Sequence, residues 1–299
     1  MKILITGAAG FVGMQMIPFF LERGHEVVGV DHNPPAGQSG HSRYTYIQAD
    51  TTEAGGWQKA VADADAVINL AGKNIFGRWT GATKTAIMES RVRTTRNVVD
   101  AFSGKKDTVL CSASAVGYYG DKGDTVIGED GGPGNDFLTE VSVAWESEAL
   151  RARDTGVRVA IMRFALVMGT TGGALPVMLP AFKAFVGGPM SDGNHFMPWI
   201  HVKDLVRAFA FVLDRPDVDG VINCSAPNPV RNAEFSRTLG KVLNRPAFFR
   251  VPGFALRLVM GELGALMLNS QRAVPEKLLK NGFSFEFPHL EGALTDLLR

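Results

Sequence analysis

Hydrophobic and polar positions change their spacing repeatedly along residues 1–165. Short apolar runs rich in β-branched residues predict buried strands, and longer segments with apolar residues every three or four positions predict helices. The expected strands are 2–5, 26–30, 44–48, 66–70, 108–112 and 157–162, and the expected helices are 11–23, 57–62, 84–102 and 137–155. Alternating strands and helices are typical of βαβ units, so we expect an α/β fold with a doubly wound, mostly parallel sheet.

The pattern changes after Arg163. Residues 169–193 are rich in glycine and proline, which favours loops. Further along we expect strands at 199–202 and 220–225 and helices at 204–213, 232–243, 254–268, 276–281 and 290–298. We therefore expect a sheet domain over 1–165, to which 200–226 returns, and a small, mainly helical C-terminal lobe over 227–299, to which 166–199 contributes. Helix 254–268 is apolar on nearly all sides, so we expect it to be buried between the lobes or at a contact in a homodimer.

Composition excludes several classes of protein. The 299 residues are 45% hydrophobic with a net charge of +1, which argues against a disordered chain and gives no overall attraction to nucleic acid or to a membrane surface. The 34 glycines exceed the average share and indicate tight turns or close backbone approaches. Cys111 and Cys224 lie in apolar runs, which predicts buried thiols, and the six histidines show no metal-ligand spacing, so we expect no metal site.

Two segments bear on the compartment. The apolar run at the N-terminus is too short for a signal peptide. The longest uncharged stretch, 164–182, contains three glycines and two prolines and would make a poor membrane helix. We therefore expect a cytoplasmic protein.

The segment Thr6-Gly7-Ala8-Ala9-Gly10-Phe11-Val12-Gly13 joins the first expected strand to the first expected helix. In a dinucleotide-binding loop the first glycine allows a tight turn, the second lets the backbone approach a pyrophosphate, and the third lets the helix pack closely. The helix N-terminus offers unpaired N–H groups to the phosphates. An ordinary loop is the alternative for a glycine triplet alone, but the position between strand and helix predicts a Rossmann-type cofactor site. Its expected residues are Gly7, Gly10, Phe11, Val12 and Gly13.

Asp31 follows the second expected strand, 18 residues after Gly13. A carboxylate there can accept both hydroxyls of an adenosine ribose and would repel a 2′-phosphate. His32 and Asn33, rather than an arginine, come next. We therefore predict that Asp31 and His32 lie at the ribose of NAD(H) rather than NADP(H); a solvated turn acid is the alternative.

The ends of the next two strands supply the remaining cofactor candidates. Asp50 is placed to contact the adenine amine. The segment that ends the fourth strand should lie along the phosphates and ribose, with glycine giving the backbone clearance. Its residues are Asn69, Leu70, Ala71 and Gly72.

The Gly-x-x-Gly-x-x-Gly spacing resembles that of extended short-chain dehydrogenase/reductases, the class that includes nucleotide-sugar epimerases. Further motifs resemble one atypical branch of "epimerase family" proteins, which ends in a domain of unknown function. They are Asn69-Leu70-Ala71-Gly72, Arg78-Trp79-Thr80, Ser90-Arg91, Ser114-Ala115-Val116-Gly117-Tyr118-Tyr119-Gly120, Pro198-Trp199-Ile200-His201, Ala226-Pro227-Asn228-Pro229-Val230-Arg231 and Gln271-Arg272-Ala273-Val274-Pro275. The resemblance covers the whole chain and implies the fold and an NAD(P) cofactor, but no substrate.

The resemblance also bears on single residues. Relatives in this branch commonly have Ser/Thr-Arg where this chain has Asp31-His32, which would suit NADP(H), so NADP(H) stays possible. Ser90 matches a hydroxyl beside the cofactor. Ser114 matches the hydroxyl that binds a substrate oxygen beside the nicotinamide; a serine capping a turn is the alternative.

Extended relatives use a Tyr-x-x-x-Lys pair on the helix after this serine. Here that helix has Leu138 and Ser142 at the two positions, so we expect the usual pair to be missing. Tyr118 and Tyr119 are the nearest substitutes, although a loop-shaping role is the alternative. A phenol without a lysine starts from a pKa of about 10, which predicts slow proton transfer that speeds up at alkaline pH.

Two further groups have both a functional and a structural interpretation. Arg91, Arg93 and Arg96 can reach phosphates or form a solvated basic face. Trp199 and His201 can line a pocket or belong to the core. Two functions remain open: an oxidoreductase or epimerase acting on a small hydroxylated or nucleotide-sugar-like substrate, and a non-catalytic NAD(P)(H)-binding regulator or scaffold.

Overall fold

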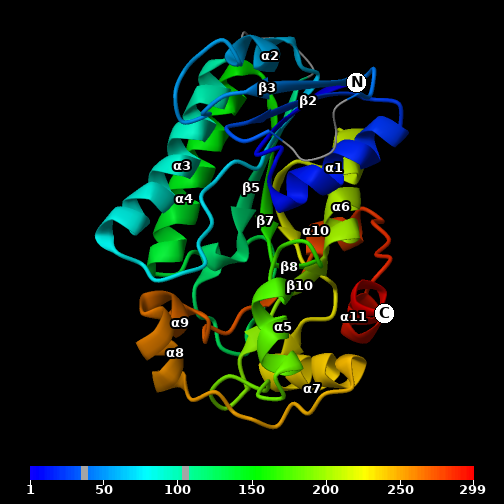
Figure 1. Cartoon of the computed structure of the whole chain (residues 1–299). Helices are drawn as coiled ribbons and strands as arrows, with labels where there is room; N and C mark the ends of the chain where they lie inside the picture. Colours follow the sequence, from blue (N-terminus) through cyan, green and yellow to red (C-terminus); the bar gives the residue numbers. More distant parts are fainter. Residues whose placement is uncertain (35–39, 103–107) are drawn as a thin grey trace.

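A seven-stranded parallel sheet forms the centre of the molecule (Figure 1). The computed structural model describes residues 1–34, 40–102 and 108–299. The strands follow one another across the sheet as β3 (Tyr44–Gln48), β2 (Glu26–Asp31), β1 (Lys2–Thr6), β4 (Ala66–Asn69), β5 (Val109–Ala115), β7 (Arg158–Phe164) and β11 (Gly220–Cys224). The order reverses direction at β1, so the doubly wound Rossmann-type sheet is confirmed.

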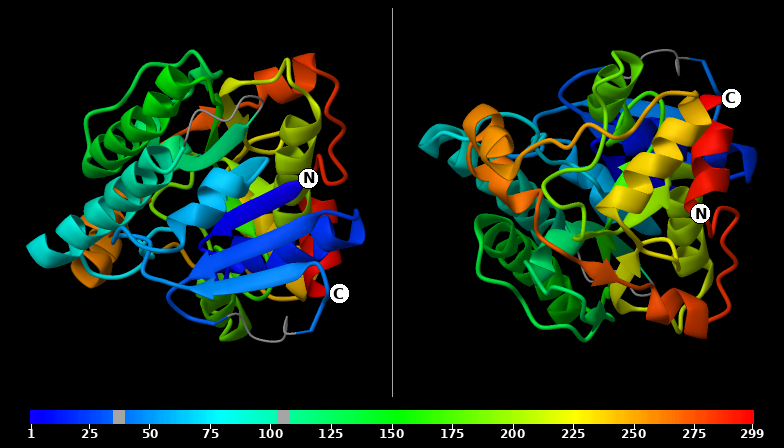
Figure 2. Two further views of the ribbon diagram at one scale, coloured as in Figure 1. Left: turned by 90° about the horizontal axis from the view of Figure 1, so that it is seen from above. Right: turned by 90° about the horizontal axis from the view of Figure 1, so that it is seen from below.

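Helices cover both faces of this sheet (Figure 2). One face packs against α1 (Phe11–Glu22) and α6 (Val202–Asp214). The other packs against α2 (Gln58–Asp63), α3 (Gly81–Asp100) and α4 (Phe137–Leu150), which continues as a 3₁₀ turn, η2 (Arg151–Thr155). Because both faces are covered, the inner strands are apolar along nearly their whole length, as the short hydrophobic runs indicate.

A second hydrophobic core lies below the carboxyl ends of the strands (Figure 1). It is built from α5 (Leu175–Lys183), α7 (Asn232–Leu243) and α11 (Leu290–Leu298). Two short ribbons join it, β8 (Leu166–Met168) with β10 (Trp199–His201), and β9 (Phe196–Met197) with β12 (Val230–Arg231). The mainly helical character expected of the C-terminal region is confirmed.

Part of the C-terminal region returns to the sheet domain. The strand β13 (Arg272–Ala273) pairs with β6 (Val126–Ile127), and α10 (Glu276–Lys280) follows it. Phe283 then joins the core that lies between the sheet and α6. No helix in the described part of the chain is long and apolar enough to cross a membrane.

Trp199 and His201 lie in the core of the protein. Their strand, β10, pairs with β8 and is not part of the central sheet, and both side chains are fully buried. His201 Nδ1 accepts the Lys203 N–H at the start of α6, and Nε2 lies 3.2 Å from Asp296 Oδ2. Burial lowers the pKa of His201. Of the two interpretations of these residues, the structure therefore supports the core.

The expected helix 254–268 is two helices, α8 (Gly253–Met260) and α9 (Glu262–Leu266), separated by Gly261 at φ +64°. Helix α8 has no buried residue, and Phe254, Leu258 and Val259 are 74%, 76% and 73% exposed. Burial between the lobes is therefore wrong for α8, because no segment among residues 1–34, 40–102 and 108–299 covers Phe254, Leu258 and Val259. A contact between two subunits at α8 stays a prediction.

Candidate functional site

The loop after β1 approaches the end of β4 more closely than a side chain would allow. Gly7 has φ +69°, and a Cβ atom on it would lie 2.9 Å from the backbone nitrogen of Ala71. A Cβ on Gly13 would lie 2.5 Å from the carbonyl oxygen of Gly7. Both positions therefore require glycine, and together they hold the start of α1 against the carboxyl edge of the sheet.

The N-terminus of α1 lies at this edge without a side-chain cap. Gly10 occupies the N-cap position and has no side chain to cap the helix, and the first turn contains no acidic residue. The first N–H groups of a helix have no partner within it, and the helix dipole adds partial positive charge there. The first turn, Phe11 to Gly13, therefore presents an anion-binding surface that suits a phosphate group.

Phe11 connects this loop to the second core. A Cβ on Gly169 would lie 2.3 Å from Phe11 Cζ, and one on Gly172 would lie 2.4 Å from Phe11 Cγ. The ring thus packs directly on the backbone of the glycine-rich loop that follows β8. The side chain is therefore engaged in packing, and only the backbone N–H of Phe11 stays a candidate for contact with a phosphate.

Asp31 ends β2 beside the glycine loop. Its side chain is 8% exposed; Oδ2 accepts the Ala9 N–H at 3.1 Å and Oδ1 accepts the Asn33 N–H at 3.0 Å. His32 Nδ1 lies 3.1 Å from Asp31 Oδ1, and the imidazole is 73% exposed. These contacts fix a negative charge next to the loop.

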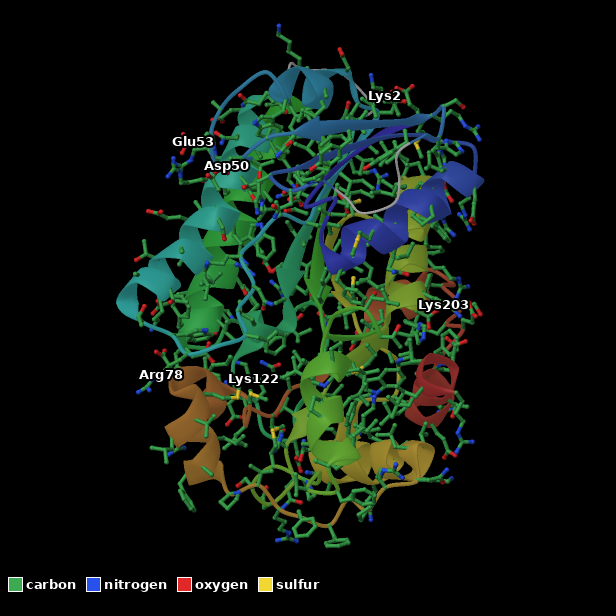
Figure 3. All side chains as sticks on the ribbon, viewed as in Figure 1. Lys2, Asp50, Glu53, Arg78, Lys122 and Lys203 are labelled. Carbon is green, nitrogen blue, oxygen red and sulfur yellow. The ribbon has the colours of Figure 1, made fainter. Side chains whose placement is uncertain are left out.

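Asp50 and Asn69 have different environments. Asp50 is exposed at the edge of the sheet near α3 (Figure 3). Its Oδ1 accepts hydrogen bonds from the N–H and the hydroxyl of Thr52, and these bonds lower the pKa of the carboxyl group. The Asn69 side chain is fully buried: it accepts from Thr6 Oγ1 at 2.7 Å and donates to the hydroxyls of Thr95 and Ser112. It holds β1, β4, β5 and α3 together, so only the backbone beyond it, residues 70–72, faces the loop.

Ser90 and Arg91 of α3 support the chain just after β4. Ser90 Oγ accepts the Lys73 N–H, and Arg91 donates to the carbonyls of Lys73 and Ile87. Arg91 also lies against Gly72 and has no carboxylate partner in the described part of the chain; burial lowers its pKa to about 10. The other two arginines of the expected basic face are paired, Arg93 with Glu53 and Arg96 with Glu148.

A buried charged pair holds Ser114 in place. Ser114 Oγ donates to Glu146 Oε1 at 2.6 Å. Arg163 donates to both oxygens of Glu146, at 2.8 and 2.7 Å, and the three residues are 2%, 6% and 3% exposed. The sequence analysis missed Glu146 and Arg163 as site residues, although a charged residue inside an apolar strand or on the buried face of a helix is an available signal.

The two tyrosines on η1 (Val116–Tyr119) differ in availability. Tyr119 is fully buried, donates to Asn223 Oδ1 at 2.7 Å, and has a pKa raised by burial. Tyr118 is partly exposed, the Arg163 guanidinium lies 3.5 Å from its ring centroid, and its hydroxyl has no partner among the described residues. The structure therefore leaves Tyr118, and not Tyr119, with a free phenol.

No tyrosine and lysine share a face of α4. Leu138 and Ser142 occupy the two positions, and Ser142 Oγ donates to the Leu138 carbonyl. The spacing Tyr-x-x-x-Lys does occur once, as Tyr118 and Lys122, but η1 ends at Gly120 with φ +64°. Lys122, labelled in Figure 3, donates from Nζ to the Pro133 carbonyl at 3.2 Å. The pair therefore lacks the geometry that one helix face would give.

Within residues 1–34, 40–102 and 108–299, no three His, Cys, Asp or Glu side chains gather in a group that could hold a metal ion. Cys111 and Cys224 are fully buried, and burial raises the pKa of the Cys111 thiol to about 12. The groups available at this edge of the sheet are therefore backbone N–H donors, carboxylates, one free phenol and a buried ion pair.

Comparison with known proteins confirms the resemblance. Residues 3–225 match the NAD dependent epimerase/dehydratase family, and residues 251–297 match a domain of unknown function. The chloroplastic epimerase family protein SDR39U1 homolog of Arabidopsis thaliana is 37% identical over 100% of this chain and 87% of its own length. The epimerase family protein YfhF of Bacillus subtilis is 35% identical over 100% of this chain and 98% of its own length.

Solved structures with a similar fold include members of the same family. The human epimerase family protein SDR39U1, crystallised with NADPH, is 30% identical, with a TM-score of 0.87 over 99% of both chains. The protein MoeE5, crystallised with UDP-glucuronic acid and NAD, is 22% identical, with a TM-score of 0.81 over 99% of this chain and 97% of its own. The second similarity shows the fold alone.

Replacing Glu146 by glutamine should destabilise the protein strongly. The change leaves the Arg163 charge buried without its carboxylate, which typically costs about 3–5 kcal/mol. Urea denaturation measures the loss. The matched control is Arg23→Met, which removes an exposed ion pair with Asp214 (N–O distance 3.8 Å) and should cost less than about 1 kcal/mol. Equal losses in the two variants would show that the buried pair does not hold this edge of the sheet.

Proposed function

This chain belongs to the NAD dependent epimerase/dehydratase family, and on that premise we propose that it is an NAD(P)-dependent oxidoreductase or epimerase acting on a small, hydroxylated substrate. The observation that carries the proposal is the uncapped N-terminus of α1, held against β4 by Gly7 and Gly13. When bound, the nicotinamide dinucleotide supplies the hydride acceptor or donor. The protein binds and orients both molecules and moves the proton.

The proposed cofactor contacts follow the carboxyl edge of the sheet. The N–H groups of Phe11, Val12 and Gly13 face the pyrophosphate, since a helix N-terminus favours an anion. The residue 70–72 backbone lies beside them, and Asp50 stands near the adenine end.

Asp31 selects NAD(H) over NADP(H) in this proposal. Its carboxylate is fixed by the N–H groups of Ala9 and Asn33 and keeps oxygen lone pairs for ribose hydroxyls. A 2′-phosphate at the same place would meet a like charge, which is unfavourable. The human relative was crystallised with NADPH. The proposed preference of this chain for NAD(H) therefore rests on Asp31 and not on membership of the family.

Replacing Asp31 by serine should weaken NADH binding and strengthen NADPH binding. Removing the charge removes both the ribose acceptor and the repulsion, so the ratio of the two dissociation constants should move at least about tenfold toward NADPH, since 1.4 kcal/mol is a factor of ten. Fluorescence titration with both cofactors measures this. Glu26→Gln, at the opposite end of β2, is the control and should leave the ratio unchanged. A wild type that binds NADPH tenfold more tightly than NADH would contradict the proposal.

Tyr118 and Ser114 carry the proton transfer in this proposal. Oxidation of a substrate carbinol moves its hydride to the nicotinamide and its hydroxyl proton to a base; reduction reverses both. Tyr118 provides the free phenol. Ser114 lies at the same strand end; its hydroxyl proton is donated to Glu146, so its oxygen can accept a hydrogen bond from the substrate hydroxyl and hold it beside the phenol. Without a lysine beside the phenol, we expect slow turnover that rises toward alkaline pH.

A second function is supported by the same geometry. The Ser114 hydroxyl is already committed to Glu146, and α4 has no Tyr–Lys pair. Both observations favour a non-catalytic NAD(P)(H)-binding regulator or scaffold. Whether the protein converts a substrate with its nicotinamide cofactor distinguishes the enzyme from the regulator or scaffold.

Replacing Tyr118 by phenylalanine should reduce turnover by about 10²-fold or more, a typical general acid–base contribution, and leave NADH affinity unchanged. The assay follows nicotinamide absorbance with a panel of aldehydes, ketones and sugars. Tyr119→Phe is the matched control: it removes a buried hydrogen bond to Asn223, so it should lower stability and keep turnover.

Full activity in Tyr118→Phe would show that another residue acts as the general acid/base. NADH binding with no turnover of any panel member by the wild type would favour the regulator or scaffold.

A further inference from the structure

Large apolar side chains face solvent at the end of the molecule opposite α2 (Figure 1). They come from three segments: the turn after α5, the chain between α7 and α8, and α8 itself. Single exposed apolar residues are ordinary on a protein surface, whereas a contiguous group marks a surface that binds a partner. Six of these side chains are more than half exposed: Phe185, Val186, Phe248, Phe254, Leu258 and Val259.

Backbone contacts hold the three segments side by side. Met190 and Val251 form an isolated parallel β-bridge, and the Val251 N–H donates to the Pro189 carbonyl at 2.9 Å. Helix α8 begins two residues after Val251, so it continues the same surface. Residues 184–190 and 247–260 therefore form one continuous surface, which we call the apolar patch.

The charged residues of the patch and its flanks are all basic. Residues 175–191 and 244–261 contain no aspartate or glutamate. Their basic side chains are exposed, and none of them forms an ion pair with a carboxylate among the described residues; they are Lys183, Arg245, Arg250 and Arg257. The Arg245 guanidinium carbon lies 4.6 Å from the centroid of the Phe185 ring, so basic and aromatic groups are mixed on this surface.

The acidic residues next to the patch interact with cations outside it. Glu262 directly follows this part of the chain and accepts hydrogen bonds from Lys84 Nζ at 2.9 Å. Asp192 directly follows the first segment and interacts with Arg231. The patch therefore carries positive charge that no carboxylate of its own segments balances, although the net charge of the whole chain is only +1. Such a surface attracts an anionic partner.

Two other occupants fit the patch less well. In a symmetric dimer the same surface of both copies meets, so the four basic residues of each copy would face like charges. A protein that captures a helix from a partner does so in an apolar groove. Phe248, Phe254 and Leu258 are at least 70% exposed, so they project from the surface instead of lining a groove. Projecting apolar side chains surrounded by basic ones suit a lipid surface, which deforms around them.

We propose that the apolar patch binds the surface of a membrane that contains anionic lipids. The apolar side chains of α8 enter the boundary between headgroups and acyl chains, and the basic side chains contact the headgroups. Apolar insertion and basic residues together supply two signals for association, and neither depends on the net charge of the chain. The proposal concerns binding alone and holds whether or not the protein binds a dinucleotide.

Co-sedimentation of the full-length protein with lipid vesicles tests the proposal. One set of vesicles is phosphatidylcholine alone, and the other is an equimolar mixture of phosphatidylcholine and phosphatidylserine. Binding to the mixed vesicles should be at least about tenfold tighter, because each basic residue near an anionic surface contributes about 1 kcal/mol, a factor of about five. This preference should decrease at high salt, since salt screens exposed charges.

Two variants test whether the patch is the surface that binds. Phe254→Gln combined with Leu258→Gln should weaken binding to the mixed vesicles about tenfold or more, since burial of one large apolar side chain typically contributes a factor of about ten. Arg257→Gln should weaken binding to the mixed vesicles about fivefold. The matched controls are Leu279→Gln, at an apolar residue of α10 that is 48% exposed, and Lys59→Gln, at an exposed basic residue of α2. Both controls should bind like the wild type.

Thermal melting of each variant establishes that it is folded. Equal binding to the two kinds of vesicle would overturn the proposal, as would no binding to either kind or unchanged binding by the folded Phe254→Gln/Leu258→Gln variant. A dimer in light scattering that this variant dissociates, together with no vesicle binding, would assign the patch to a second copy of the chain and would also overturn the proposal. Each of these results leaves the proposed dinucleotide site unaffected.

Discussion

The close approach of the first loop to the end of β4 is the constraint on which this edge of the sheet depends. Gly7 and Gly13 leave no space for a side chain, so the start of α1, the loop and the residue 70–72 backbone lie together. The same approach directs the uncapped N–H groups of the helix toward the space where an anion can bind. Phe11 extends the constraint, because its ring packs on the backbone around Gly169 and Gly172 and couples the loop to the second core.

A buried charge sets the second constraint. Arg163 lies in a central strand and must be neutralised, since an isolated buried charge is very unfavourable. Glu146 of α4 neutralises it and orients Ser114, while the Tyr118 ring packs on the guanidinium. This arrangement occupies the end of β5, beside a helix α4 that contains neither tyrosine nor lysine. We propose that a dinucleotide binds at this edge of the sheet, and the same edge offers few groups for proton transfer, which is why a catalytic and a non-catalytic function are both proposed.

Much of the fold can be predicted from the sequence, because short apolar runs and amphipathic segments are local signals. The expected ranges 44–48, 232–243 and 290–298 coincide with β3, α7 and α11. The glycine loop and Asp31 were also found as candidates, since their spacing follows from one strand–loop–helix unit.

Features that depend on distant contacts were missed. Glu146 and Arg163 are 17 residues apart, and neither signals its partner. The apolar pattern of 254–268 predicts burial but does not show whether the chain has a segment to cover it, and α8 is exposed. The hydrogen bond from the Ser270 N–H to Asp121 likewise joins loops whose residues are 149 positions apart in the sequence.

The central claim is that the first turn of α1 binds the phosphates of a nicotinamide dinucleotide. The most direct measurement is a titration of the nitrogen-15-labelled protein with NADH, followed through the amide resonances of Phe11, Val12 and Gly13. The account predicts large shifts at these three amides, because each gains a charged acceptor, and none at the amides of α8. Saturable NADH binding that leaves these three amides unchanged and shifts another region instead would contradict it.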